Sequence, residues 1–263
     1  MNELLELARN GVPLPVEIID LHGHIGRWSF PVPELSTASI VEVMDRIGIE
    51  KYFCSHMQCM GTSIEYGNDA VSLAVKEFPG RVHGYISLFP WSRDVVVGEV
   101  KKRLTQGFSG IKLHSNNGFR YDNEAYEPAY EIADDLGLPI LFHTWGSKED
   151  LRELRQLSAH YPNASLLAAH AGATNEAGYI ALANECPNVY LDLSFSGSYR
   201  GLVKRFVDAV NPEQIVWGSD GYFFGQAQQL GKVIGADISD ELKKMILGGN
   251  AKRIISKIKT GVK

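Results

Sequence analysis

Cysteine is scarce in this chain, with Cys54, Cys59 and Cys186 as the three examples among 263 residues. An odd number of cysteines without paired spacing argues against a disulfide framework and favours a reduced protein. No apolar run is long enough to span a bilayer. The first ten residues include Glu3 and Glu6 and lack the apolar core of a secretory signal. These features predict a cytoplasmic protein without a membrane partner.

A surplus of charge of one sign is also absent. The 26 basic and 31 acidic side chains give a formal charge of −5, and they are interspersed along the chain. Without a basic patch or an acidic tail, a nucleic-acid partner is not expected. Repeats, low-complexity segments and linkers are missing too, so residues 1–263 are predicted to form one domain. The expected partner is a small-molecule substrate, and assembly into a homo-oligomer stays open.

What the chain does contain is an alternation of two kinds of segment. Apolar runs rich in β-branched or aromatic residues lie near 17–22, 51–56, 82–89, 109–114, 138–143, 165–170, 188–194 and 214–219. Segments with helical spacing follow near 37–47, 68–78, 93–104, 125–136, 148–161, 175–184 and 201–210. Eight strand–helix units predict an α/β protein, a single (β/α)8 TIM-type barrel with C-terminal helices. A doubly wound open sheet is the alternative. The last two helices are expected at 241–247 and 251–258, split by Gly248 and Gly249.

The first predicted strand leads into two histidines, because residues 18–24 read Ile-Ile-Asp-Leu-His-Gly-His. Side chains alternate along a strand, so Asp20, His22 and His24 are expected on one face and the apolar residues between them on the other. Two neutral imidazoles on one face are suited to grip Zn²⁺ or another borderline cation. An isolated His-x-His is more often two ordinary histidines, so the other strand ends must support this interpretation.

Polar residues follow most of the other predicted strands as well. In a barrel the carboxyl ends of the strands meet at one face, where the active sites of barrel enzymes lie. Five of the eight histidines fall at such ends. Together with His22 and His24, the strand-end residues are Lys112, His114, His143, His170, Asp192 and Asp220. Scattered surface histidines would not gather in this way, so the pattern predicts a metal site.

Six short motifs occur in a fixed order between about Glu17 and Ile255. They are Asp-Leu-His-Gly-His, Gly-Ile-Lys-Leu-His, Phe-His, Ala-His-Ala-Gly, Trp-Gly-Ser-Asp and Gly-Asn-Ala-Lys-Arg-Ile. In this order they resemble the amidohydrolase superfamily, and in particular the amidohydrolase-related group that includes aminocarboxymuconate-semialdehyde decarboxylase-like enzymes. The resemblance implies a barrel with one or two divalent metal ions at the carboxyl ends of the strands.

Residue by residue, the resemblance also implies roles. His22, His24 and His143 become ligands through nitrogen, and Asp220 becomes an oxygen ligand or the base that transfers a proton. His170 matches a histidine that sits beside the metal ion and acts on the substrate. The catalytic residues are therefore expected to be Asp220 and His170.

Four further residues are predicted to bind the substrate. Lys112 and His114 share one face of strand four; a lysine at the first position is carbamylated in members with two metal ions, whereas the following histidine resembles members with one. Arg27, in the first strand–helix loop, is suited to meet a substrate carboxylate. Trp145 is suited to wall the pocket. A solvated arginine and an aromatic residue in the core are the plain alternatives for these two.

The ligand set favours Zn²⁺, with Mn²⁺ as the alternative, because it combines three nitrogens with one oxygen.

A metal-activated water that loses its proton to Asp220 could attack an amide, ester or lactone carbonyl while His170 polarises the substrate. A metal-dependent hydrolase is the main expectation, since the wider group is mostly hydrolytic. The alternative is a non-oxidative decarboxylase (carboxy-lyase) of a small aromatic or unsaturated carboxylic acid. A non-enzymatic metal-binding protein is disfavoured because the sequence has a residue for each metal-ligand and proton-transfer role.

Three more polar residues stay open between a supporting role and a structural one. Asp20 is expected either to orient a ligand histidine or the first loop, or to cap the backbone. Asp192 faces inward beside Asp220, and either supports the site or is a hydrogen-bonded core residue. His56 ends the second strand and either faces the pocket or packs outside it.

Overall fold

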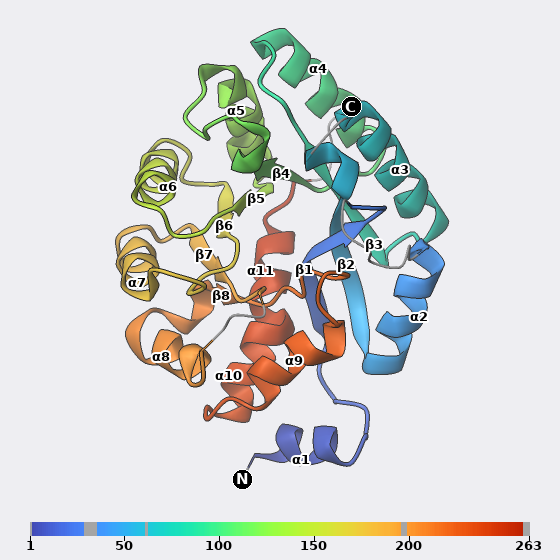
Figure 1. The fold of residues 1–263 in the computed structure, drawn as a ribbon, viewed down its shortest axis with the longest axis vertical. Helices are drawn as coiled ribbons and strands as arrows, with labels where there is room; N and C mark the ends of the chain where they lie inside the picture. Colours follow the sequence, from blue (N-terminus) through green and yellow to red (C-terminus); the bar gives the residue numbers. More distant parts are fainter. Residues whose placement is uncertain (1, 29–35, 61–62, 196–198, 260–263) are drawn as a thin grey trace.

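Eight parallel strands follow one another around a barrel in chain order (Figure 1). The computed structural model describes residues 2–28, 36–60, 63–195 and 199–259. The strands are β1 Ile18–Ile25, β2 Ile49–His56, β3 Val82–Ser87, β4 Gly110–His114, β5 Pro139–His143, β6 Ser165–Ala168, β7 Val189–Asp192 and β8 Ile215–Val216. Each pairs in parallel with the next. The predicted (β/α)8 barrel is confirmed, and the open sheet is not formed.

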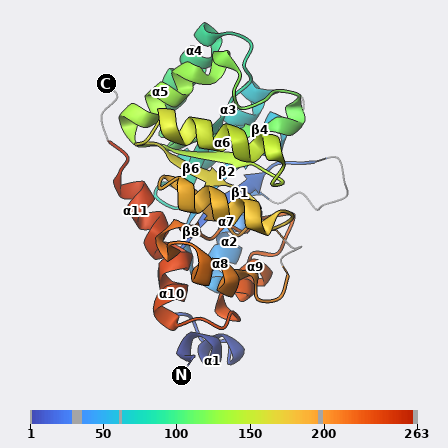
Figure 2. The same cartoon turned by 90° about the vertical axis from the view of Figure 1, so that its left-hand side faces the viewer.

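Helices lie outside the barrel, most of them between consecutive strands and others before β1 or after β8 (Figure 2). They are α1 Glu3–Arg9, α2 Thr37–Ile47, α3 Ile64–Glu77, α4 Arg93–Leu104, α5 Glu127–Leu136, α6 Lys148–His160, α7 Glu176–Glu185, α8 Leu202–Ala209, α9 Gln226–Ile234, α10 Asp240–Lys244 and α11 Asn250–Ser256. A serine hydroxyl caps the start of several of them by accepting a backbone N–H: Ser36, Ser63, Ser92, Ser147 and Ser239. These caps explain why α2, α4 and α6 begin where the spacing predicts.

The barrel closes where the chain segment after β8 meets β1. The backbone N–H of Leu21 donates to the Trp217 carbonyl at 3.2 Å, and that of Asp220 donates to the His22 carbonyl at 2.7 Å. The N–H of His24 donates to the Gly221 carbonyl at 2.6 Å. This seam therefore brings the first and last predicted ligand segments together, although they lie almost 200 positions apart.

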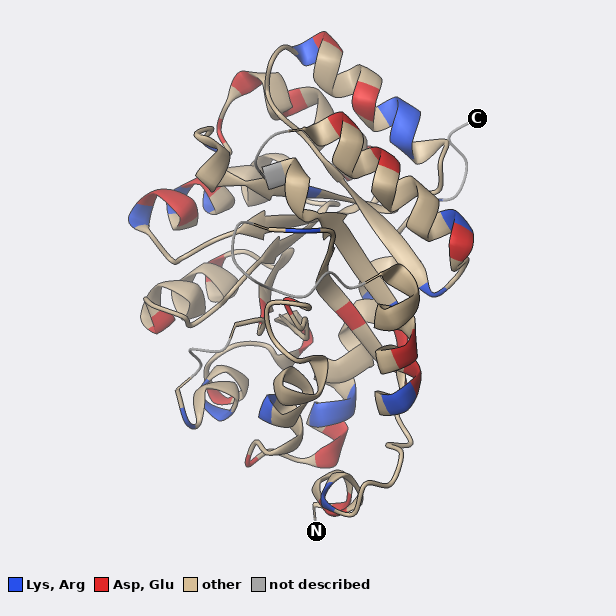
Figure 3. Ribbon diagram, turned by 45° about the vertical axis from the view of Figure 1, so that its right-hand side comes forward, with Lys and Arg blue, Asp and Glu red and all other residues tan. Residues whose placement is uncertain are grey.

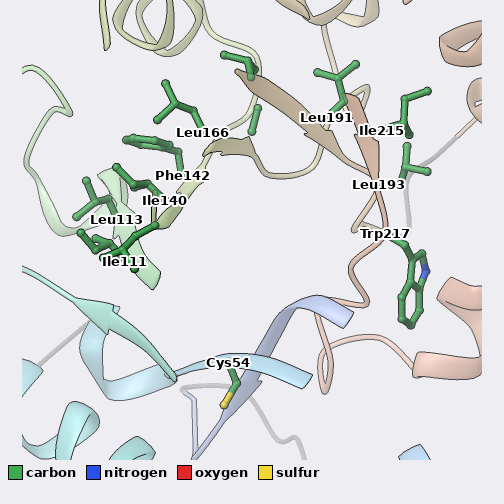
Figure 4. Close-up of a cluster of buried hydrophobic side chains, with 14 of the residues drawn as sticks. Cys54, Ile111, Leu113, Ile140, Phe142, Leu166, Leu191, Leu193, Ile215 and Trp217 are labelled. Atoms are coloured by element: carbon green, nitrogen blue, oxygen red, sulfur yellow. The ribbon is translucent and has the colours of Figure 1, made fainter. Parts of the chain in front are cut away.

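The strands separate two apolar layers. Alternate side chains point outward against the helices, including Ile111, Leu113, Ile140, Phe142 and Leu191 (Figure 4). Inside the barrel is a smaller cluster that comprises Ile19, Leu21, Phe53, Tyr85, Leu141, Leu167, Ala169, Tyr190 and Val216, with Ala251 and Ile254 of α11. On β4 and β5, the residues that alternate with the outward ones are Lys112, His114 and His143, so the polar positions face the barrel interior.

The helix α11 covers the amino-terminal ends of the strands. Asn250 donates to the Ile215 carbonyl at 2.6 Å, and Lys257 donates to the Tyr190 hydroxyl at 3.0 Å.

The predicted break at Gly248 and Gly249 is wrong, because α10 continues through a π-helical turn, Met245–Gly249, directly into α11. Gly248 serves another purpose: a Cβ there would lie 2.0 Å from the Glu17 carbonyl oxygen. Glycine permits close packing against the entry to β1 rather than ending the helix.

Strict alternation along β1 also fails. Between Asp20 and Gly23 the chain advances three residues while its partner strand advances two, from Tyr52 to Cys54. Such a bulge adds one residue and redirects the side chains that follow it. The expected single face from Asp20 to His24 is therefore interrupted.

Charged residues lie mostly on the outer helices (Figure 3). Among the described residues, no helix has the length and apolar character needed to cross a membrane.

Candidate metal centre

A pocket of about 500 Å³ opens at the carboxyl ends of the strands. Its polar lining residues come from strand ends in the first, fourth, fifth, sixth and eighth units. Its lining residues are His24, Trp28, Met57, His114, Asn116, His143, Trp145, His170, Phe195, Asp220, Phe223 and Phe224. Side chains far apart in the sequence thus share one cavity at the face that barrel enzymes use for catalysis.

Three of the four predicted ligands form a compact group. One ligand atom each of His22, His24 and Asp220 lies within 4.8 Å of the others, and all three residues are buried. His24 Nε2 is 3.1 Å from Asp220 Oδ1, and His22 Nε2 is 3.6 Å from the same oxygen. Two imidazole nitrogens therefore converge on one carboxylate oxygen, a donor set that suits a borderline divalent cation.

Two glycines create the space for this group. A Cβ on Gly218 would lie 2.5 Å from the Cβ of His22 and 2.6 Å from Asp192 Oδ1. A Cβ on Gly23 would overlap the ring of Tyr52, whose hydroxyl accepts from His24 N at 2.8 Å and donates to the Gly221 carbonyl at 2.8 Å. The absence of both side chains lets the strand ends approach closely enough for their polar groups to meet.

The far nitrogen of each clustered histidine is held by another polar group. His22 Nδ1 lies 2.7 Å from Asp192 Oδ2, and the Ser55 hydroxyl lies 3.2 Å from His24 Nδ1. Hydrogen bonds of this kind orient the ring and raise the basicity of the other nitrogen. Asp192 thus has the supporting role that the sequence left open. Ser55 was not foreseen, because a serine in a strand carries no signal of its own.

His143, the fourth predicted ligand, lies beside this group rather than within it. Its ring stacks on His114 with centroids 3.7 Å apart, and its Nδ1 is 3.2 Å from His170 Nε2. Its Nε2 is buried and has no hydrogen-bond partner among the described residues. A buried polar atom without a partner is costly unless a ligand satisfies it. The Tyr121 hydroxyl donates to the His143 carbonyl and fixes this end of β5.

Burial sets the ionisation of the cluster. It lowers the pKa of His170 to about 4 and that of His114 to about 2, and it lowers the pKa values of His22, His24 and His143 as well. Neutral imidazoles keep a lone pair for a cation. Burial alone would raise the pKa of the Asp220 carboxyl, but the His24 hydrogen bond and nearby positive charge outweigh it, so the pKa is lowered.

Two of these residues occupy the left-handed backbone region. His170 has a φ of 59° and Asp220 a φ of 53°. Such conformations are uncommon outside glycine and persist only where the surrounding structure enforces them, as at functional sites. At Asp220, the hydrogen bonds to the β1 seam provide that enforcement.

Asp20 is a buried carboxylate that caps backbone N–H groups, which is the second of the two roles expected for it. Its carboxylate accepts from the backbone N–H groups of His22 at 3.1 Å and Ser219 at 2.9 Å, and from the Ser219 hydroxyl at 2.5 Å. Burial raises its pKa to about 7. Asp20 thereby ties β1 to the segment that carries Asp220.

Two of the four predicted substrate-binding residues line the pocket, and two do not. His114 and Trp145 line the pocket. Lys112 is buried with its Nζ 3.2 Å from His22 Nε2, and burial lowers its pKa to about 8. Arg27 is exposed, and its neighbour Trp28 rather than Arg27 is among the described residues that line the pocket. His56 packs edge-on against Tyr66 outside the pocket.

Ser194 is a site residue that the sequence did not single out. Its hydroxyl lies 3.0 Å from both His22 Nδ1 and His170 Nδ1, and 2.5 Å from Asp192 Oδ2. The signal that could have found it is its position two residues after Asp192, on the same face of the chain beyond β7.

The residues present fit a divalent cation. The donors are two imidazoles and a carboxylate in one buried group. A third imidazole nearby, that of His143, has a buried nitrogen without a partner among the described residues. The contact of His22 Nδ1 with Asp192 turns the other ring nitrogen of His22, Nε2, toward the group. A (β/α)8 barrel whose strand ends carry such a site has the architecture of a metal-dependent barrel enzyme. The sequence matches the family model described as amidohydrolase over residues 19–256, and the chain belongs to this family.

Solved structures with the same fold include several decarboxylases. The 5-carboxyvanillate decarboxylase of Sphingomonas paucimobilis is 15% identical, with a TM-score of 0.74 over 93% of this chain and 100% of that one. The dihydroxybenzoic acid decarboxylase of Polaromonas sp. JS666, solved with manganese and 2-nitroresorcinol, is 17% identical, with a TM-score of 0.75 over 92% and 97%. A probable 2-pyrone-4,6-dicarboxylic acid hydrolase of Acinetobacter baumannii is 15% identical, with a TM-score of 0.65 over 91% and 99%. No protein of curated function matches the sequence.

Proposed function

We propose that this protein is a metal-dependent, non-oxidative decarboxylase of a small aromatic or unsaturated carboxylic acid. The observation that carries the proposal is the pocket, whose polar donors lie among flat aromatic walls. Trp145 stacks on His170 with centroids 5.0 Å apart, and Phe195 meets Trp145 edge-on at 5.3 Å. Walls of this kind suit a planar ring. The decarboxylases among the structural relatives support this choice over the hydrolase that the sequence favoured.

The proposed reaction breaks the bond between a ring carbon and its carboxylate. The electron pair stays on the carbon, carbon dioxide leaves, and the carbon takes up one proton that solvent ultimately supplies. When bound, the metal ion would supply Lewis-acid stabilisation of negative charge on the substrate oxygens. His22, His24, His143 and Asp220 would hold it. Asp220 and His170 are the proposed proton carriers, because both line the pocket and adjoin the ligand group.

The other site residues have proposed roles that follow from their positions. Trp145 and His114 would contact the substrate ring, since both line the pocket. Lys112 lies behind His22 and would stabilise negative charge at the base of the site. Arg27 remains proposed as a contact for a substrate carboxylate, because its side chain is exposed and it lies two residues beyond the end of β1.

For the metal ion we propose Mn²⁺ or Zn²⁺. A nitrogen-rich donor set favours Zn²⁺, whereas two of the decarboxylase structures were solved with manganese. A hydrolase is the second candidate, because the relative from Acinetobacter baumannii carries that activity in its name. Asp220 would then take a proton from the attacking water, and the substrate would be an amide, ester or lactone.

The test is carbon dioxide release by purified protein reconstituted separately with Mn²⁺ and Zn²⁺. The substrates are hydroxybenzoic acids with a hydroxyl next to the carboxylate, with lactones and N-acyl compounds as the hydrolytic arm. We expect release from at least one hydroxy acid and loss of that activity in a variant carrying both His22→Ala and His24→Ala. Turnover confined to the lactone or N-acyl compounds would replace the decarboxylase by the hydrolase.

A further inference from the structure

Ser194 lies just beyond β7 and is buried, with its hydroxyl between three ionisable side chains. The hydroxyl oxygen is 2.5 Å from Asp192 Oδ2 and 3.0 Å from both His22 Nδ1 and His170 Nδ1. The backbone N–H of Ser194 also donates to Asp192 Oδ1 at 3.1 Å. The backbone N–H and the side-chain hydroxyl of Ser194 are therefore both held by the carboxylate of Asp192.

The number of available protons determines how these groups are bonded. A serine hydroxyl has one proton, and a carboxylate only accepts, so the short contact assigns that proton to Asp192. His22 Nδ1 donates to the same oxygen at 2.7 Å, and its Nε2 accepts from Lys112 Nζ at 3.2 Å. The Ser194 oxygen then has only lone pairs to offer His170.

It follows that Nδ1 of His170 carries the ring proton. A second acceptor lies in the same direction, because the Ser194 carbonyl oxygen is 3.4 Å from this nitrogen. In a neutral imidazole the other nitrogen, Nε2, is then an acceptor. The group facing it at 3.2 Å is His143 Nδ1, which must be the donor of that pair.

The chain of donors ends at the predicted fourth ligand. If His143 donates through Nδ1, its Nε2 holds a lone pair, and this is the buried atom that has no partner among the described residues. The hydrogen bonds from His143 to His170, from His170 to Ser194 and from Ser194 to Asp192 thus all run in one direction, and they leave an unshared lone pair on His143 Nε2. The same carboxylate leaves a lone pair on His22 Nε2.

We propose that Ser194 is a positioning residue that fixes the tautomer of His170 and, through His170, the tautomer of His143. Its hydroxyl keeps the His170 lone pair on Nε2, where it accepts from His143 Nδ1, and so leaves His143 Nε2 available to a cation. The proposal rests on the metal site and the His170 role proposed above. A ring held in the other tautomer would present an N–H where a lone pair is needed, as happens when the partner that orients a histidine is lost.

The direct experiment is long-range ¹H–¹⁵N correlation spectroscopy of metal-free protein labelled at histidine, with His170→Asn and His143→Asn used to assign the signals. In the wild type we expect both rings to be protonated at Nδ1 and unprotonated at Nε2. A wild-type His170 protonated at Nε2 would overturn the proposal without any need for a serine variant.

Three variants extend the test. Ser194→Ala removes the hydroxyl at 3.0 Å and leaves His170 Nδ1 only the longer contact with the backbone carbonyl at 3.4 Å. His170 should therefore shift toward the Nε2-protonated tautomer, and Mn²⁺ affinity should fall by about 10- to 100-fold. Ser194→Thr keeps the hydroxyl and should restore the wild-type tautomer. Ser158→Ala is the control: it removes another buried serine hydroxyl, which donates to Asn188 at 2.5 Å and does not line the pocket. It should leave both readouts unchanged.

Unaltered His170 signals and Mn²⁺ affinity in Ser194→Ala would contradict the proposal, as would equal losses in Ser158→Ala. Both readouts are independent of turnover. A protein that showed the expected tautomers but released no carbon dioxide would disprove the decarboxylase and leave the role of Ser194 intact. Decarboxylation by a protein whose His170 is protonated at Nε2 would support the decarboxylase and disprove the role of Ser194.

Discussion

Single residues control how closely the strand ends meet, and Gly218 is the clearest case. Gly218→Ala should weaken Mn²⁺ binding by about 10- to 100-fold, because the new methyl group would displace His22 and the carboxylate that orients it. It should also lower the stability by about 1–3 kcal/mol through overpacking. Titration calorimetry with Mn²⁺ and thermal unfolding measure the two effects.

Gly98→Ala provides the matched control for that substitution. Gly98 is a residue within α4, and a Cβ there meets no atom within 4 Å. This variant should bind Mn²⁺ like the wild type and unfold at the same or a slightly higher temperature. Wild-type affinity in Gly218→Ala would show that the close approach at this seam is irrelevant to the metal site.

The proton-transfer residues make a second prediction at this scale. Asp220→Asn keeps the shape of the side chain but removes its basicity, so it should retain metal and fold while losing about 10²–10⁴ of the rate. His170→Asn should lose a similar factor, and because it removes the partner of His143 Nδ1 it should also weaken Mn²⁺ binding, as expected for Ser194→Ala. Turnover and metal content have to be measured on the same samples. A nearly normal rate in Asp220→Asn would remove this carboxylate from the mechanism.

The sequence could indicate the ligands but not their partners. His22, His24 and Asp220 were predictable because each interrupts an apolar run at a strand end, where a barrel has its active site. Ser55 was not, since a serine within a strand has no signal of its own, and Ser194 had only its position two residues after Asp192; the contact with a histidine gives each of them its meaning. Asp20 was singled out from the sequence, but its partner Ser219, 199 positions away, was not.

At the scale of elements, strand and helix positions follow from local patterns. The helices Thr37–Ile47 and Arg93–Leu104 have the predicted bounds, because a serine caps the start of each and apolar residues recur along both at helical spacing. Two features of the elements depend on neighbours instead. The bulge in β1 and the π-helical turn at Met245–Gly249 both adapt one segment to another that is distant in sequence, so no local pattern announces them.

Gly248 and Gly249 of the π-helical turn give a matched test of whether close packing against the entry to β1 is what requires glycine there. Gly248→Ala should destabilise the protein by about 1–3 kcal/mol, because its Cβ would lie 2.0 Å from the rigid Glu17 carbonyl oxygen. Gly249→Ala should be neutral or stabilising, since its nearest contact is 3.7 Å and its backbone is helical, with a φ of −57°. Chemical denaturation compares the two. Similar stability in both variants would show that the close approach to Glu17 is not what requires glycine here.

At the scale of the whole molecule, metal binding and barrel closure should be coupled. His22 belongs to β1, and Asp220 follows β8, so an ion held by both would link the two sides of the closing seam. Ligand binding to the folded state alone stabilises it, by about 2.7 kcal/mol at a ligand concentration 100 times Kd. For a chain of this size we expect Mn²⁺ or Zn²⁺ to raise Tm by about 5–10 °C.

The control for this effect is the variant with both His22→Ala and His24→Ala. Elemental analysis should give about one divalent ion per chain in the wild type and none in this variant, and added metal should no longer raise its Tm. A metal-dependent rise of equal size in the variant would place the stabilising ion elsewhere in the molecule.

The most direct measurement is anomalous X-ray diffraction from crystals of the Mn²⁺-loaded protein, recorded on both sides of the manganese edge. The central claim is that the carboxyl ends of the strands form one metal centre. It predicts a single strong peak within bonding distance of one ligand atom each of His22, His24, His143 and Asp220. A loaded crystal without a peak at this position, or with the peak held by other residues, would contradict it.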